Sequence, residues 1–156
     1  DMHSTVVCLV IDFMQHSAHW AHSGDSRMYW FRDGRVLDRT RDHSLVQGLV
    51  DSGVLTPEQI RVHPKRSELR SALGLAPDIL EVSAQEVQAG DVFLLCTDGL
   101  WEYLDDAVLE STLSAANNPG AWIGELATAV RAAAAHKTSH DNFSALTVWT
   151  RAAPAA

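Results

Sequence analysis

The chain has few cysteines, a shortage of basic side chains and no long hydrophobic run, and each scarcity excludes a class of protein. Its two cysteines, Cys8 and Cys96, lie singly in apolar runs, which excludes a disulfide framework and predicts small buried hydrophobes in a reducing cytoplasm. Lys and Arg number 12 against 20 Asp and Glu, a formal net charge of -8 that argues against a nucleic-acid partner. No apolar stretch approaches the roughly 18 residues of a membrane span. We therefore expect a cytoplasmic protein without membrane insertion.

The length of 156 residues favours one domain. We expect it to cover residues 1–151, with a small-residue tail at 152–156. The chain opens on Asp1 rather than Met, which fits a fragment or a processed form.

Alternating and continuous apolar runs predict strands near both ends of the chain, with helices between them. The Asp-Gly pair at 33–34 predicts a hairpin turn within an antiparallel meander. We therefore predict an α+β protein. Strands are expected at 5–12, 18–23, 27–31, 35–38, 79–87, 92–97 and 145–150, and helices at 45–52, from 57 to before Pro64, at 106–116 and at 121–136.

Two aspartates stand at the edges of apolar runs that are typical of buried strands. Asp98 follows the run at 93–97, and Asp141 precedes the run at 145–150. Because an isolated buried charge costs several kcal/mol, something must compensate these carboxylates. Aspartates at strand ends are what a divalent-cation site uses.

Further motifs join these two: Gly-Asp-Ser-Arg at 24–27, Asp-His-Ser at 42–44, Cys-Thr-Asp-Gly-Leu at 96–100 and Asp-Asn at 141–142. In this order and spacing they closely resemble the metal-dependent serine/threonine phosphatases of the PPM (PP2C) family, in their bacterial form. The resemblance covers nearly the whole chain, but the family's N-terminal Asn-Glu-Asp and Asp-Gly-Met-Gly-Gly segments have no counterpart before Asp1. It implies a PP2C-like sandwich of antiparallel β-sheets flanked by helices, N-terminally truncated, in which residues 1–151 form the C-terminal portion.

The resemblance also implies the site and its chemistry. Asp98 and Asp141 match shared, catalytically essential metal ligands, and Asp25 matches an aspartate that helps to hold an additional, weaker metal together with Asp98. The cofactor implied is Mn²⁺ or Mg²⁺, with two or three ions in the complete domain, and hard oxygen ligands suit both ions. The family's other metal-binding carboxylates and its phosphate-contacting arginine belong to the N-terminal part.

Structural alternatives stand beside these roles. Asp98 and Gly99 could form an ordinary turn, and Asp25 could form an Asx-type turn between strands. Arg27 is expected to make structural hydrogen bonds.

Three histidines, His43, His63 and His140, lie beside turns or a proline and do not form a metal-ligand spacing. Residues 46–66 correspond to the family's flap near the active site, and its Pro-Lys-Arg at 64–66 is interpreted as a solvated basic turn rather than a phosphate contact.

The function implied is metal-dependent hydrolysis of phosphoserine or phosphothreonine in proteins by a metal-activated water. The partner is then a phosphorylated protein, such as the substrate of a bacterial Ser/Thr kinase. The alternative is a non-catalytic fragment or pseudo-phosphatase that acts as a phosphoprotein-binding module. We expect the chain alone to be impaired in catalysis, because part of the ligand set lies in the family's N-terminal segment.

Overall fold

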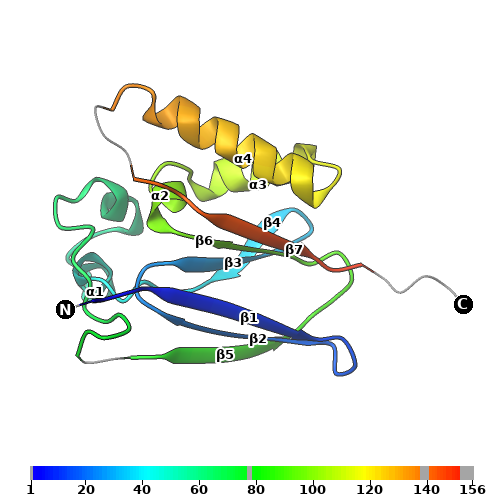
Figure 1. Cartoon of the computed structure of the whole chain (residues 1–156), viewed down its shortest axis with the longest axis horizontal. Coiled ribbons are helices and arrows are strands. Elements are labelled where there is room, and N and C mark those ends of the chain that lie inside the picture. The colour runs from blue at the N-terminus through cyan, green and yellow to red at the C-terminus, as the bar shows by residue number, and fades with distance from the viewer. Residues whose placement is uncertain (1, 77–78, 138–140, 152–156) are drawn as a thin grey trace, which may run out of the picture.

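Two antiparallel sheets and a layer of helices form three layers (Figure 1). The computed structural model describes residues 2–76, 79–137 and 141–151. The first sheet has the order β1-β2-β5 and the second the order β4-β3-β6-β7. The strands are β1 (Val6–Asp12), β2 (Ser17–Ser23), β3 (Arg27–Arg32), β4 (Arg35–Arg39), β5 (Glu81–Glu86), β6 (Val92–Cys96) and β7 (Ala145–Trp149). The helices are α1 (Leu45–Asp51), the 3-10 helix η1 (Pro57–Val62), α2 (Asp98–Trp101), α3 (Asp106–Ala115) and α4 (Pro119–Ala134).

The second sheet joins strands from both ends of the chain, as the sequence predicts. Strand β6 pairs with β3 on one side and with β7 on the other, and every pairing among the named strands is antiparallel. The β3–β4 hairpin turns through Asp33 and Gly34, whose φ angles of 51° and 75° are both positive. This geometry is the type I′ turn that Asp-Gly favours. The predicted α+β sandwich of antiparallel sheets is confirmed.

The continuous apolar run of β6 is explained by burial on both faces. Phe93 points between the two sheets, where it packs with Trp20 and Trp30. Leu94 lies in the other core, between the second sheet and the helices, together with Trp122. A strand covered on both sides needs no polar alternation, so its sequence reads as an unbroken hydrophobic segment.

Several helices differ in type or boundary from those predicted from local sequence signals. The segment after Thr56 forms a 3-10 helix, and a short helix, α2, that the sequence did not indicate begins at Asp98. Helix α4 begins at Pro119 rather than at 121, because the Asn118 side chain accepts a hydrogen bond from the Ala121 N–H. The Asn-Pro pair at 118–119 is therefore a helix start, with Pro in the first turn.

The prediction that both cysteines are buried is wrong for Cys8, which is exposed, and right for Cys96. Cys8 lies on the outer face of β1, whereas its neighbours Val7 and Leu9 pack into the core between the sheets. Exposed Val10 and Val82 show that this outer face is partly apolar. Among the described residues, no helix is long and apolar enough to cross a membrane. The predicted tail at 152–156 lies outside the described residues.

Candidate metal centre

Asp25 lies in the tight connection between β2 and β3, at one end of the sandwich. The preceding Gly24 has φ +103°, and a Cβ there would lie 2.5 Å from the Thr5 Cγ2 atom, so glycine is required on both grounds. Trp101 in α2 donates its indole N–H to the Asp25 carbonyl oxygen at 2.9 Å. The turn is thereby held against the helix that begins at Asp98, and Asp25 is only 7% exposed.

Asp98 and Asp141 belong to segments that run side by side beyond the ends of paired strands. Cys96 of β6 lies opposite Ala145 of β7. The ladder continues past the strands, because the Thr97 N–H donates to the Ser144 carbonyl oxygen at 3.1 Å. Residues that follow β6 therefore meet the residues that precede β7.

The backbone of Gly99 lies directly against this second segment. A Cβ at Gly99 would lie 2.4 Å from the Asn142 carbonyl oxygen, so only glycine permits the approach. The Asp98 carboxylate accepts a hydrogen bond from the Gly99 N–H at 2.8 Å, which orients it at the start of α2. Asp98 and Asp141 are thus each one residue away from a backbone contact between their two segments.

The electrostatics of Asp25 indicate a site that would gain from a cation. Burial, followed by the charges of Asp98 and Asp42, raises the pKa of Asp25 from 3.8 to about 7. Carboxylates that repel one another in a partly dehydrated site are stabilised when a divalent ion neutralises them. The oxygen-only donor set fits Mn²⁺ or Mg²⁺ rather than a metal that prefers nitrogen or sulfur.

Arg27 has the structural role expected of it. Its guanidinium makes two parallel hydrogen bonds to Asp42, each 2.8 Å long, and a third to the Tyr29 hydroxyl at 3.0 Å. It also stacks over the Trp101 ring at 3.5 Å from the centroid. Asp42 is therefore paired with Arg27. The sequence did not indicate the roles of Asp42 and Trp101, because both depend on partners distant in the chain.

The basic turn at 64–66 lies at the rim of the acidic site. Arg66 forms an ion pair with Glu102 at 2.8 Å, and the pKa of Arg66 is raised mainly by this hydrogen bond, with a smaller contribution from the Asp141 charge. Arg61 donates to the carbonyl oxygens of Trp101 and Leu104, at 2.8 and 3.1 Å. The flap-like segment is therefore attached to the structure around α2, and Arg66 is partnered rather than freely solvated.

The three histidines considered from the sequence have different surroundings. The His63 ring accepts from the Lys65 N–H at 3.1 Å within its own turn, and His140 lies outside the described residues. His43 lies close to His22 and Glu81, a grouping that the sequence did not indicate.

Comparison with known proteins places this arrangement in context. No family model matches the chain. The serine/threonine protein phosphatase PstP of Mycobacterium tuberculosis is 43% identical over 91 residues, which are 58% of this chain and 18% of PstP. The protein phosphatase PhpP of Streptococcus pneumoniae is 35% identical over 92 residues, 58% of this chain and 37% of PhpP.

Solved structures cover more of the chain. The M. tuberculosis PstP/Ppp structure superposes with a TM-score of 0.83 at 28% identity, over 95% of this chain and 60% of that one. PppA of Pseudomonas aeruginosa gives 0.79 at 35% identity, over 96% and 58%. A PstP catalytic domain in complex with 2 manganese ions gives 0.75 at 26% identity, over 93% and 57%. The chain thus spans less than two thirds of these relatives.

Proposed function

Because the chain belongs with the bacterial PP2C-type (PPM) serine/threonine protein phosphatases, we propose that it carries part of the two-metal centre of such an enzyme. The reaction is hydrolysis of phosphoserine or phosphothreonine in a protein substrate by a metal-activated water. In this proposal residues 1–151 are the C-terminal portion of the phosphatase domain. The PstP structure that contains 2 manganese ions supports Mn²⁺ as the cofactor, with Mg²⁺ as the other candidate.

The observation that carries the proposal is the electrostatic coupling of buried Asp25 with Asp98, together with the backbone contact beside Asp98 that brings in the segment of Asp141. The charge of Asp98 acts on buried Asp25, and the Gly99–Asn142 contact holds the Asp141 segment beside Asp98. Carboxylates that repel one another are unfavourable for the folded protein without a cation, whereas a metal centre requires them, and in this proposal Asp141 joins Asp25 and Asp98 there.

Each aspartate has a distinct role in this proposal. Asp98 and Asp141 would be ligands of the main metal centre, and Asp25 together with Asp98 would hold an additional, weaker ion. The bound ions would lower the pKa of a coordinated water and neutralise charge on the phosphoryl group. Arg27 holds Asp42 in a bidentate pair, and Trp101 positions the backbone of Asp25.

The 156-residue chain alone is proposed to be a poor catalyst. It spans 60% of the PstP/Ppp structure, and the family resemblance implies further ligands in the uncovered part. Missing ligands leave neither the nucleophilic water nor the charge neutralisation in place. The alternative, a non-catalytic phosphoprotein-binding module, is not favoured, because binding alone has no need of clustered carboxylates.

The substrate class follows from the same proposal. We infer that the substrate is a phosphorylated protein, such as the product of a bacterial Ser/Thr kinase. We also infer that this chain acts in the cytoplasm, where the exposed Cys8 thiol stays reduced. The net charge of -8 remains unsuited to nucleic acid.

The test combines metal binding with turnover. Calorimetry with Mn²⁺ is expected to show binding by the 156-residue chain that Asp98→Asn and Asp141→Asn weaken by at least about tenfold. Asp33→Asn is the matched control, since Asp33 lies in the β3–β4 turn with φ 51°, which asparagine tolerates. Equal Mn²⁺ binding by wild type and Asp98→Asn would overturn the assignment of Asp98.

Hydrolysis of a phosphothreonine peptide is measured on the same proteins, and on any longer polypeptide that the gene encodes in frame before Asp1. We expect slow turnover by residues 1–156 and Mn²⁺-dependent turnover by a longer protein, abolished by Asp98→Asn or Asp141→Asn. Rapid metal-dependent turnover by residues 1–156, lost in Asp98→Asn, would disprove the proposed impairment and leave the phosphatase assignment standing.

A further inference from the structure

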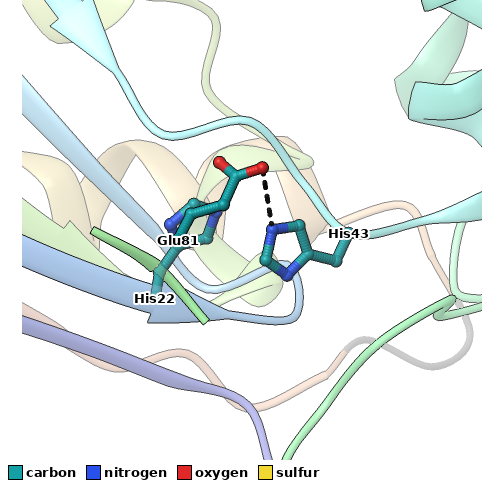
Figure 2. Close-up of side chains that lie close together, drawn as sticks. All are labelled: His22, His43 and Glu81. Atoms are coloured by element: carbon teal, nitrogen blue, oxygen red, sulfur yellow. Dashed lines mark ion pairs between the residues drawn. The ribbon is translucent and has the colours of Figure 1, made fainter. Parts of the chain in front are cut away.

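A second group of metal-ligand side chains, His22, His43 and Glu81, lies at the end of the first sheet (Figure 2). Each offers one nitrogen or oxygen ligand atom, and these atoms all lie within 4.8 Å of one another. Strand pairing brings together two of the three residues, because His22 of β2 lies directly opposite Glu81 of β5. Side chains at opposed positions of an antiparallel pair are close neighbours on the same face of the sheet.

His43 reaches the same point from the segment between β4 and α1. Its ring stacks on that of His22, with 4.6 Å between centroids and 27° between planes. Two backbone contacts with Gly24 hold it there, since the His43 N–H donates to the Gly24 carbonyl oxygen at 2.9 Å and the Gly24 N–H donates to His43 Nδ1 at 3.3 Å. The ring is therefore fixed rather than free to turn into solvent.

The hydrogen bonds of His22 leave one ring nitrogen available as a ligand. His22 Nε2 lies 2.7 Å from the Arg41 carbonyl oxygen, and because a carbonyl only accepts, Nε2 carries the proton. In the neutral ring, Nδ1 is then the nitrogen with a free lone pair. A histidine that donates one ring N–H to a carbonyl and presents its other nitrogen has the arrangement typical of a metal ligand.

His43 presents a buried nitrogen that lacks a hydrogen bond. Its side chain is 8% exposed, and Nε2 lies 3.4 Å from Glu81 Oε1, as the dashed line in Figure 2 marks. Within the described part of the chain, this nitrogen has no partner with hydrogen-bond geometry. A buried polar atom without a hydrogen bond is uncommon in a folded protein, and a bound ion is one of the standard explanations.

From this geometry we propose that His22, His43 and Glu81 form a binding site for a divalent transition metal of the Zn²⁺ type, separate from the aspartate centre. Two imidazoles and one carboxylate are a donor set found in zinc sites, with water as the fourth ligand. Nitrogen donors select zinc over Mg²⁺, whereas the all-oxygen set of Asp25, Asp98 and Asp141 suits Mg²⁺ or Mn²⁺.

Solvent can reach the group, because polar clefts flank it on two sides. One, of about 320 Å³, is lined by residues that include His43, Glu81 and Arg70. Another, of about 360 Å³, is lined by residues that include His22, Glu81 and Asp38. Glu81 faces both clefts and its side chain is 56% exposed, so an ion can enter on its side of the group.

Zinc binding has one structural cost, and it falls on the backbone next to Asp25. Coordination through His43 Nε2 requires that nitrogen to lose its proton, so Nδ1 takes the proton and becomes a donor. The Gly24 N–H, which now donates to Nδ1 at 3.3 Å, must then turn away. This long hydrogen bond is replaced by a metal–nitrogen bond, and the Gly24 amide reports on the exchange.

The experiment uses the 156-residue chain without an affinity tag, carrying Asp98→Asn to weaken the aspartate centre. Calorimetry with Zn²⁺ is expected to show one tight equivalent, weakened by at least about tenfold in His22→Gln and in Glu81→Gln. The matched control is His19→Gln, because His19 is an exposed histidine on the same strand and on its other face. Co²⁺ serves as a second probe, with a four-coordinate visible spectrum expected to vanish in Glu81→Gln.

Glu81→Gln keeps the test decisive if the buried His22→Gln protein does not fold, since Glu81 is largely exposed and glutamine has its shape. In amide NMR spectra, Zn²⁺ is expected to shift the Gly24 resonance in the Asp98→Asn protein and to leave it unmoved when Glu81→Gln is added. Zinc binding that is equal in His19→Gln and Glu81→Gln, or that is no tighter than Mg²⁺ binding, would overturn the proposal. Neither result would bear on the aspartate centre.

Discussion

Gly99→Ala tests whether one backbone contact holds the two main aspartate segments together. The new Cβ would lie 2.4 Å from the Asn142 carbonyl oxygen, about 1 Å inside ordinary van der Waals contact. Because the obstacle is backbone, the Asp141 segment must move away from Asp98. Overpacking of this kind lowers the free energy of unfolding by about 1–3 kcal/mol, while alanine in place of glycine in a helix raises it by up to about 1 kcal/mol.

The net expectation for Gly99→Ala is a loss of roughly 1–2 kcal/mol in the free energy of unfolding, which lowers Tm by about 2–8 °C in a chain of this size. The same displacement should weaken Mn²⁺ binding by about 10- to 100-fold, as is typical when the groups that orient metal ligands are disturbed. Urea unfolding measures the free energy of unfolding, and calorimetry measures the Mn²⁺ affinity.

Gly124→Ala is the control for Gly99→Ala. Gly124 lies in α4, and a Cβ there would meet no heavy atom within 4 Å among the described residues. This variant should be as stable as wild type, or up to about 1 kcal/mol more stable, with unchanged Mn²⁺ affinity. If Gly99→Ala kept both wild-type stability and wild-type Mn²⁺ affinity, the argument that this contact assembles the site would be refuted.

Three further outcomes are expected. Asp42→Asn leaves the buried Arg27 guanidinium without its charge partner, so urea unfolding should show a loss of about 3–5 kcal/mol, and a wild-type midpoint would contradict this reading. Trp101→Phe removes the donor to the Asp25 carbonyl oxygen and should lower the free energy of unfolding by about 1–3 kcal/mol. It should also weaken Mn²⁺ binding, and unchanged Mn²⁺ affinity would count against the role of Trp101. Without metal, the pKa of Asp25 is raised from 3.8 to about 7, so the protonated form is favoured by folding. Stability should fall as pH rises from about 4 to about 7, by up to about 4 kcal/mol, and Asp25→Asn should remove this slope; parallel pH profiles of the two proteins would argue against a buried, repelled carboxylate.

Most strands could be predicted from the sequence, because their signals are local. The apolar run of β6 and the Asp-Gly pair at 33–34 indicate a buried strand and a hairpin without reference to any distant residue. The helix starts were harder. A cap such as Asn118 and a single helical turn such as α2 depend on one or two hydrogen bonds, and competing local interpretations differ little in free energy.

The sequence pattern alone could not predict which face of the first sheet packs into the core. Strand β1 carries apolar residues on both faces, so the sequence does not show that Val7 packs inward while Cys8 faces outward. Only the pairing of β1 with β2, and the packing of that sheet on the second sheet, decides which side is covered. A shift of one residue in register would exchange the two sets of side chains.

The sequence by itself determined the types of candidate ligand and their local settings, with Asp98 and Asp141 at strand ends and Asp25 in a turn between two strands. Tertiary structure decided which of these groups meet. The Gly99–Asn142 approach joins segments more than 40 residues apart, and the register of β2 with β5 sets His22 opposite Glu81. Such contacts form only when the packing of the whole domain offsets the entropy of closing long loops. That balance is a property of the entire chain, so no local pattern around His22 or His43 could reveal that they lie beside Glu81.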